Sequence, residues 1–444
     1  RGYSPAGVEA YNCIRSLDYL QSRSEVDGDR IGVTGRSGGG AYSWWIAAID
    51  DRIGVAVPVA GITNLKNHVV DGCVEGHCDC MYMVNTYRWD YAMVAALIAP
   101  RPLLICNSDK DRIFPLDGVV DIYERVRRIY SLYDATDQLG LQITEGPHQD
   151  TQELRIAAFR WMNRFLREDR DLIETAARPL FEKRLLKVFD KLPDDQRVTT
   201  IHESFVPKVD AGQFDQGEPV AVESLVAELK QRCFRGWPET PEPLDITVSK
   251  QGAVAEQAHV VEFTSQTPFR LKIFLLGPVE DGRVPLKVTV VDDAKWENLA
   301  PGLAVLFPGH VPGVTPDSER AKELKQYSQS NSVAYVVPRG IGPTAWTRNE
   351  RKRTHLRRRF MLLGQTRDGM RVWDVTRAAA AVREVAGMKD VPLAIRGERQ
   401  MAGVALYASL FTPKVARLDL YCLPKSHRDG PIFLNVLRFL DIPQ

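Results

Sequence analysis

The sequence predicts an α/β fold in which a mostly parallel sheet is flanked by helices. A second α/β domain is expected later in the chain. Short apolar segments at 31–34, 53–60, 102–106 and 139–144 are separated by helical segments. These segments do not alternate with polar residues, which is typical of parallel strands covered on both faces. Strand-like segments that end in glycine or proline return from about residue 298 onward. Two α/β domains are therefore expected.

The first domain begins with a helix and a strand joined to a second helix by a glycine-rich turn. Apolar residues recur every three or four positions over 8–20, which predicts one face of a helix. Residues 31–50 have the pattern strand, turn, helix. Asp150 and Glu153 form a plausible capping box for a closing amphipathic helix. The first domain is therefore expected to cover 1–167.

Three further regions follow the first domain. Residues 168–244 are rich in charged side chains, and we expect a helical linker region that ends in a proline-rich connection. Strand-like segments predict a small β-rich segment at 245–297. The region 298–444 is expected to be the second α/β domain, with strands at 303–309 and 333–340.

The second domain contains a faint repeat of the first. Residues 371–410 reproduce in order the helix, turn, strand, tight turn and helix of residues 8–50. Arg399 falls in the position that Ser37 holds in the first copy. Because an arginine side chain stays protonated, it cannot serve as a nucleophile. The second domain is therefore expected to be a degenerate copy that has lost this chemistry.

Composition excludes several classes of partner. The chain has 444 residues with 58 basic and 57 acidic side chains, a net charge of +1. Such a balance supplies no long-range field for nucleic acid or anionic lipid. No apolar stretch approaches the ~20 residues of a membrane helix. The basic run 348–359 is expected to be a solvated helix or loop. We therefore expect no nucleic-acid and no membrane partner.

The chain begins at Arg1 rather than at methionine, in what looks like an element already in progress. We expect the native N-terminus to lie upstream, which leaves an export signal and the compartment undetermined.

The strongest chemical motif is the pentapeptide G-R-S-G-G at 35–39, a G-x-S-x-G pattern between a strand and a helix. Glycines on both sides let the chain turn so tightly that Ser37 lies at the tip. The turn also places the Gly38 N–H at a helix N-terminus, where it can donate to an oxyanion. The alternative is a glycine-rich turn with a capping serine. The strand-to-helix context favours the nucleophile.

A serine nucleophile needs a base and an acid that orients the base. The strand at 102–106 is followed by NSDKDRIFP, which offers Asp109 and Asp111. We favour Asp111, with Asp109 as a solvated or turn-capping residue. The strand at 139–144 is followed by EGPHQD, which contains His148. The alternative for His148 is a loop residue that caps the next helix.

Residues 73–80, CVEGHCDC, could bind zinc, but only half of the usual pair of cysteine motifs is present. We expect no metal here and interpret the segment as a wall or lid of a substrate cleft. Most of the nearby aromatic residues are expected in the core. Trp44, Trp45 and Tyr82 are candidates for a substrate-binding surface.

At GVTGRSGGG, NSDKDRIFP and EGPHQD the sequence resembles the α/β-hydrolase superfamily, in particular its acetyl xylan esterase-like, dienelactone hydrolase-like and prolyl-oligopeptidase-like branches. The resemblance covers about residues 1–167. It implies a Ser37, Asp111, His148 triad, with Gly38 in the oxyanion hole and no cofactor. It also implies that the first strands of the fold, with the loop carrying a second oxyanion donor, precede Arg1.

The resemblance implies a serine esterase that deacetylates a carbohydrate such as acetyl xylan. A small-molecule or carbohydrate ester is then the expected partner. Two alternatives stay open: a prolyl-oligopeptidase-like serine peptidase and a non-catalytic pseudo-hydrolase that only binds.

Overall fold

The computed structural model consists of two compact units. The N-terminal unit comprises Tyr3–Pro207 with Thr354–Gly364, and the C-terminal unit comprises Arg1–Gly2, Lys208–Arg353 and Gln365–Gln444. The structure describes residues 4–75, 83–173, 181–204, 222–250, 258–278, 285–385, 388–438 and 441–442.

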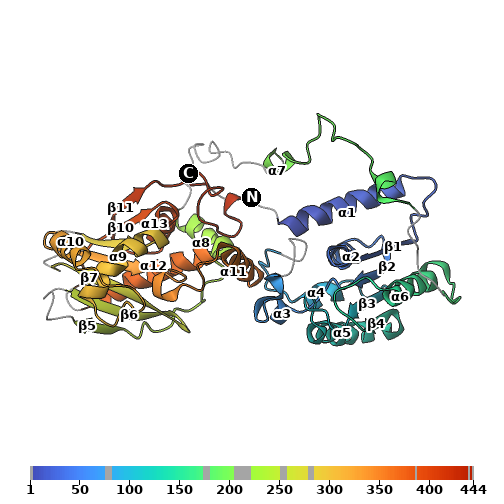
Figure 1. Cartoon of the computed structure of the whole chain (residues 1–444), viewed down its shortest axis with the longest axis horizontal. Coiled ribbons are helices and arrows are strands. Elements are labelled where there is room, and N and C mark those ends of the chain that lie inside the picture. The colour runs from blue at the N-terminus through green and yellow to red at the C-terminus, as the bar shows by residue number, and fades with distance from the viewer. Residues whose placement is uncertain are drawn as a thin grey trace. The chain divides into compact units, whose positions relative to one another are not determined.

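The N-terminal unit is built on a four-stranded parallel sheet in the order β1-β2-β3-β4 (Figure 1). Its strands are β1 (Ile31–Arg36), β2 (Ile53–Val59), β3 (Leu103–Ser108) and β4 (Leu139–Thr144). Its main helices are α1 (Pro5–Gln21), α2 (Gly38–Ile49), α3 (Leu65–Val69), α4 (Tyr91–Ala96), α5 (Leu116–Ser131) and α6 (Gln152–Met162). All four strands predicted in this region are present, and they form the expected parallel sheet.

Buried apolar side chains cover both faces of this sheet. Successive strand residues point to opposite faces, and along β3 Leu103 and Ile105 join one core while Leu104 and Cys106 join another. The first core is completed by α1, α2, α4 and α5, and the second by α6. Burial on both faces explains why these strands are continuously apolar in the sequence.

A segment far away in sequence completes the first core. The helix α11 (Glu350–Leu362) contributes its residues from Thr354 onward to the N-terminal unit. Leu362 is fully buried in the first core, and its carbonyl accepts a hydrogen bond from Asn85 Nδ2 (2.9 Å). Arg359 pairs with Glu75 (2.5 Å). The basic run is therefore a helix with one packed face, rather than the solvated segment that its charge predicts.

Replacing Leu362 with alanine is expected to destabilise the N-terminal unit by about 2–5 kcal/mol, because the change leaves a cavity in a packed core. Leu363→Ala is the matched control, since its exposed side chain contributes little to the core. Calorimetric unfolding with resolved transitions measures the difference. Equal effects of the two substitutions would contradict the placement of Leu362.

The C-terminal unit is built on a seven-stranded sheet in the order β11-β10-β8-β9-β7-β6-β5 (Figure 1). The first four strands in this order are parallel, and β7, β6 and β5 run antiparallel to their neighbours. The strands are β5 (Thr247–Lys250), β6 (Ala258–Gln266), β7 (Phe269–Leu276), β8 (Leu286–Val290), β9 (Val333–Val337), β10 (Leu393–Glu398) and β11 (Val415–Tyr421). The helices are α8 (Val222–Cys233), α9 (Asp293–Leu306), α10 (Ser318–Ser328), α12 (Arg367–Glu384) and α13 (Gln400–Leu410). The strands expected in a separate β-rich segment at 245–297 thus belong to the same sheet as those of the region 298–444.

Three local predictions are wrong. The segment 303–309 begins in α9 instead of forming a strand, because Asp292 caps this helix and a short buried apolar run fits either element. The residues 181–204 of the expected helical linker hold only short turns of helix, since their exposed side chains provide no packing to support longer ones. The helix α6 is capped by Thr151, whose side chain accepts the Leu154 N–H, rather than by Asp150.

The predicted repeat has a close geometric counterpart. Ser37 lies between β1 and α2, at the N-cap of α2, with φ 58° and ψ −115°. Arg399 lies in the same way between β10 and α13, with φ 52° and ψ −122°. The Ser37 N–H donates to the Val59 carbonyl (2.9 Å), and the Arg399 N–H donates to the Tyr421 carbonyl (2.9 Å). Both units therefore contain the same strand, tight turn, helix and parallel strand.

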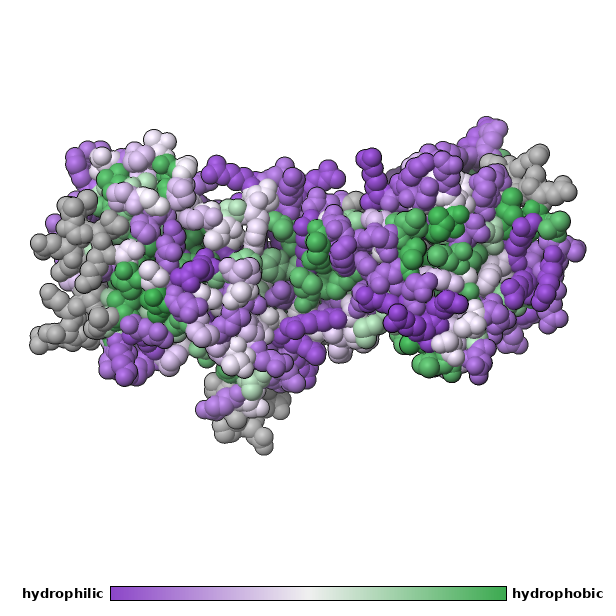
Figure 2. All heavy atoms as spheres, turned by 90° about the horizontal axis from the view of Figure 1, so that it is seen from below, coloured by the Kyte–Doolittle hydropathy of each residue, from purple (hydrophilic) through white to green (hydrophobic). Residues whose placement is uncertain are grey.

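Polar and charged side chains are spread over much of the surface in Figure 2, with apolar areas between them. Among the described residues, no helix is both long enough and apolar enough to cross a membrane.

Candidate active site

Ser37 lies on a strained turn at the carboxyl end of β1. Its positive φ is costly for a residue with a side chain, and such strain persists where the surrounding structure enforces it. Gly35 makes the turn sterically feasible, because a Cβ there would lie 2.6 Å from the backbone carbon and oxygen of Gly39. The G-x-S-x-G spacing therefore follows from the close approach of two backbone segments.

Gly38 is the first residue of α2, which makes its N–H a candidate donor to an oxyanion. The first intrahelical hydrogen bond of this turn joins the Ala41 N–H to the Ser37 carbonyl (2.9 Å). The N–H groups that precede Ala41 in the helix have no carbonyl one turn earlier to accept them. These N–H groups form the positive end of the helix dipole, where a negative charge is stabilised.

The carboxylate of Asp111 is buried and fixed by three hydrogen-bonding groups. Its Oδ1 accepts the N–H groups of Ile113 (2.8 Å) and Phe114 (3.0 Å). Its Oδ2 lies 2.7 Å from Nδ1 of His148. The side chain of Asp111 has no exposed surface, and that of His148 is 16% exposed. Asp111 is therefore the carboxylate that contacts the imidazole of His148.

Asp109 forms its hydrogen bonds with the loop after β4, and not with the imidazole that Asp111 contacts. Its Oδ1 accepts the N–H of Gly146 (2.8 Å), and its own N–H donates to the Thr144 carbonyl (2.9 Å). The Lys110 N–H also donates to the Gly146 carbonyl (3.0 Å). These bonds tie the loop after β3 to the loop after β4, which carries His148. Asp109 is thus an exposed residue, as expected, whose side chain also joins these two loops.

The loop of His148 also contacts the turn of Ser37. Arg36 Nη1 donates to the carbonyl of His148 (3.3 Å). A carboxylate at Nδ1 holds the imidazole in the tautomer whose Nε2 can accept a proton. The structure thus bonds the loop that carries His148 to the turn that carries Ser37.

Trp44, one of the candidate substrate-binding residues, has a structural position instead, and Trp45 is half-buried beside it. Trp44 is fully buried, and its indole N–H donates to the Gly61 carbonyl (2.7 Å), so it offers no surface to a substrate. Trp45 stacks on Trp44 with ring centroids 4.3 Å apart and packs against the same core. Tyr82 lies outside the described residues. Apolar periodicity cannot separate a core aromatic residue from one that lines a cleft.

The cysteine-rich segment is only partly described, since 76–82 lies outside the described residues. Cys73 is buried, and desolvation together with nearby carboxylates raises the pKa of its thiol to about 11. A metal ligand would have to be a thiolate. Within the described ranges, no cluster of histidine, cysteine and acidic side chains suits a metal ion.

Comparison with known proteins assigns the domain type. Residues 4–139 match the model of the prolyl oligopeptidase family. The N-terminal unit contains an α/β-hydrolase domain. Over 163 residues, the chain is 33% identical to YtaP of Bacillus subtilis (strain 168), which is named as a hydrolase, covering 36% of this chain and 54% of that protein. The chain thus spans about half the length of this curated relative.

Solved structures of two esterases are also similar to part of the chain. The methylesterase BT1017 is 28% identical with a TM-score of 0.31, covering 36% of this chain and 35% of that chain. The glucuronoyl esterase from Sporotrichum thermophile is 22% identical with a TM-score of 0.32, covering 38% of this chain and 53% of that chain.

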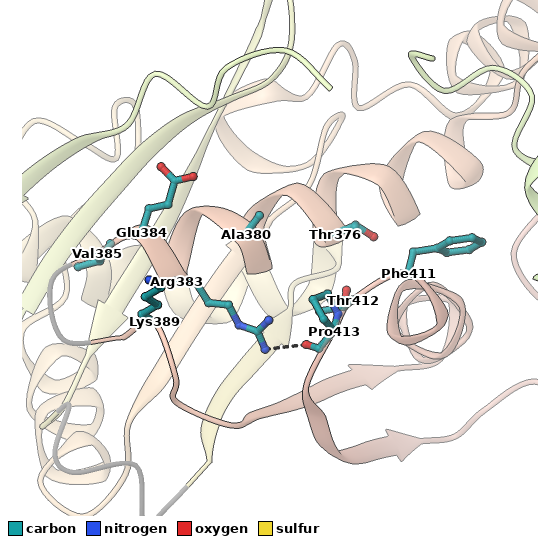
Figure 3. Close-up of a pocket in the computed structure, with 9 residues that line it drawn as sticks. All are labelled: Thr376, Ala380, Arg383, Glu384, Val385, Lys389, Phe411, Thr412 and Pro413. Carbon is teal, nitrogen blue, oxygen red and sulfur yellow. Dashed lines mark hydrogen bonds between the residues drawn. The ribbon is translucent and has the colours of Figure 1, made fainter. Parts of the chain in front are cut away.

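A cavity of about 710 Å³ lies in the C-terminal unit (Figure 3). It lies beside the last turns of α12 and the turn after α13. The Arg383 guanidinium points across it and donates to the Pro413 carbonyl (2.6 Å). Because that guanidinium bonds to the backbone, its interaction fixes the turn.

Proposed function

We propose that the α/β-hydrolase domain is a serine-dependent carboxylic-ester hydrolase that removes acyl groups, acetyl first among them, from a carbohydrate. The observation that carries the proposal is the 2.7 Å contact between His148 Nδ1 and the buried Asp111 carboxylate, in a loop bonded to the turn of Ser37. The carbohydrate part rests on the resemblance of the three motifs to acetyl xylan esterase-like enzymes.

The proposed reaction has two halves. His148 Nε2 takes the proton of Ser37 as Oγ attacks the ester carbonyl, and the Gly38 N–H donates to the oxyanion. The C–O bond to the sugar then breaks, and the alcohol leaves with the proton from His148. In the second half His148 deprotonates a water molecule, which attacks the acyl-enzyme. The acid is released, and the proton returns to Ser37.

A fluorophosphonate probe is expected to label Ser37 in the protein, because only an activated serine reacts with such a probe. Peptide mapping by mass spectrometry locates the adduct. Acetate release from acetylated xylan then tests the substrate class. An intact folded protein that stays unlabelled would favour the non-catalytic alternative, in which both units only bind.

A serine peptidase is the second candidate, and the match of residues 4–139 to the prolyl oligopeptidase family favours it. Cleavage of a proline-containing peptide without release of acetate from xylan would support this alternative. Labelling of Ser37 is expected in both cases, so only the comparison of substrates separates them.

We also propose that the C-terminal unit is a degenerate hydrolase. Its tight turn has the backbone geometry of the Ser37 turn, but Arg399 stands where the nucleophile would be. This unit would then serve the protein by binding rather than by catalysis.

A further inference from the structure

The two units differ in what covers one face of their sheets. In the N-terminal unit, Thr34 of β1 pairs with Val57 of β2, and Val57 is buried under α6. At the matching position of the C-terminal unit, Arg396 of β10 pairs with Asp419 of β11. The residues of β11 are mostly half-buried or exposed. One face of β10 and β11 in the C-terminal unit therefore presents polar groups. The matching face of β1 and β2 in the N-terminal unit is apolar and packed.

A cavity of about 240 Å³ lies where α9 borders this polar face. Opposite residues of neighbouring strands share a face, so Tyr335, Thr289 and Arg396 form a row across β9, β8 and β10. This row forms one wall of the cavity, and Lys295 of α9 forms another. The polar lining residues are Thr289, Lys295, Asn298, Tyr327, Tyr335 and Arg396.

The cavity has an excess of positive charge. No acidic side chain lines it. Within the part of the chain that the structure describes, Lys295 and Arg396 have no ion-pair partner. The guanidinium carbon of Arg396 lies 4.6 Å from the centroid of the Tyr421 ring. Asp419 is paired with Arg417 instead (2.9 Å). Two half-buried cations therefore line a cavity that has no acidic side chain in its wall.

Two carboxylates do lie nearby, and both are close to another cation. Asp292 and Glu398 line a small neighbouring cavity that shares Lys295 and Arg396. Arg399 lies 4.0 Å from each of these carboxylates. Arg399, which occupies the position of Ser37 in the repeat, thus partly neutralises the negative charge of these two carboxylates.

The uncharged polar groups that line the cavity can form hydrogen bonds with the hydroxyl groups of a polyol. Thr289 and Tyr335 provide hydroxyls, and Asn298 provides an amide. The Tyr335 hydroxyl carries a proton to donate at neutral pH, as any tyrosine does, and burial raises its pKa further, to about 12. A volume of 240 Å³ is below the roughly 300–1,000 Å³ of sites for drug-sized ligands, which limits the occupant to about one sugar ring.

We propose that this cavity binds a small acidic sugar, with Lys295 and Arg396 on its carboxylate or phosphate group and the hydroxyl and amide groups on its ring hydroxyls. A planar guanidinium and an ammonium suit either anion. The proposal does not depend on the function proposed for Ser37.

Titration calorimetry of the full chain with glucuronate, glucose 6-phosphate, glucose and inorganic phosphate tests the proposal. At least one acidic sugar is expected to bind, more tightly than glucose and more tightly than phosphate. Arg396→Gln and Lys295→Gln are each expected to weaken its binding roughly tenfold or more. The matched control Lys322→Gln removes an exposed cation of α10 that does not line the cavity, and it should leave binding unchanged.

Whichever acidic sugar binds identifies the anion, and either one supports the proposal. The absence of binding by both acidic sugars would overturn it, as would glucose binding as tightly. Binding of inorganic phosphate as tight as that of the acidic sugars would overturn the assignment to a sugar. Unchanged binding in both cavity variants, with wild-type unfolding temperatures, would place the ligand elsewhere.

Discussion

Replacing Ser37 with alanine is expected to lower ester hydrolysis by a factor of about 10³ or more, because the attacking oxygen is lost while the oxyanion donor remains. The turn keeps its shape, since the alanine occupies the same backbone conformation. Release of acetate from acetylated xylan, or hydrolysis of an aryl acetate, measures the loss.

Two further variants separate chemistry from folding. Ser37→Gly should be as inactive as Ser37→Ala, yet more stable by about 1 kcal/mol, because glycine tolerates the positive φ at this position. Arg399→Ala changes the matching turn of the C-terminal unit, and it should leave hydrolysis unchanged. Full activity of Ser37→Ala would end the nucleophile proposal.

Replacing Asp111 with asparagine is expected to reduce turnover by about 10⁴-fold, the size of effect seen when a catalytic histidine is held in the wrong tautomer. The asparagine Oδ1 can still accept the N–H groups of Ile113 and Phe114, so the loop is expected to remain folded. Its amide N–H would face His148 Nδ1 and favour the tautomer with a proton on Nε2. That nitrogen could then no longer accept the serine proton.

The control for Asp111 lies two residues earlier on the same loop. Asp109→Asn keeps an oxygen for the Gly146 N–H and does not contact the imidazole, so turnover should fall by no more than a few-fold. A larger loss in Asp109→Asn than in Asp111→Asn would reverse the assignment of the acid. Steady-state turnover of both variants, with their unfolding temperatures, decides between these outcomes.

Sequence reasoning works best where the constraint is local. The turn at Ser37 is visible because neighbouring backbone segments touch, and only glycine fits at Gly35. The matching turn at Arg399 could be found for the same reason, since it repeats the order of elements around it. The parallel strands of the N-terminal unit are visible because burial on both faces makes each of them apolar throughout.

The failures have a physical reason as well. A buried apolar run such as 303–309 fits a helix or a strand, and the packing of the C-terminal unit selects α9. Trp44 looks like a cleft residue in the sequence, but its burial against Tyr91 places it in the core. No local signal shows that Leu362 completes a core whose other residues lie more than 200 positions earlier.

The sequence by itself predicted the tight turn at Ser37, the parallel strands whose following loops carry Asp111 and His148, and the existence of a second copy of the turn. Each of these is encoded in a few adjacent residues, so reading the chain is enough. The tertiary structure alone decided which aspartate faces the imidazole, and which cations line a cavity that has no acidic side chain in its wall. Such features depend on distances between side chains of different strands and helices, and those distances are set only when the sheets pack.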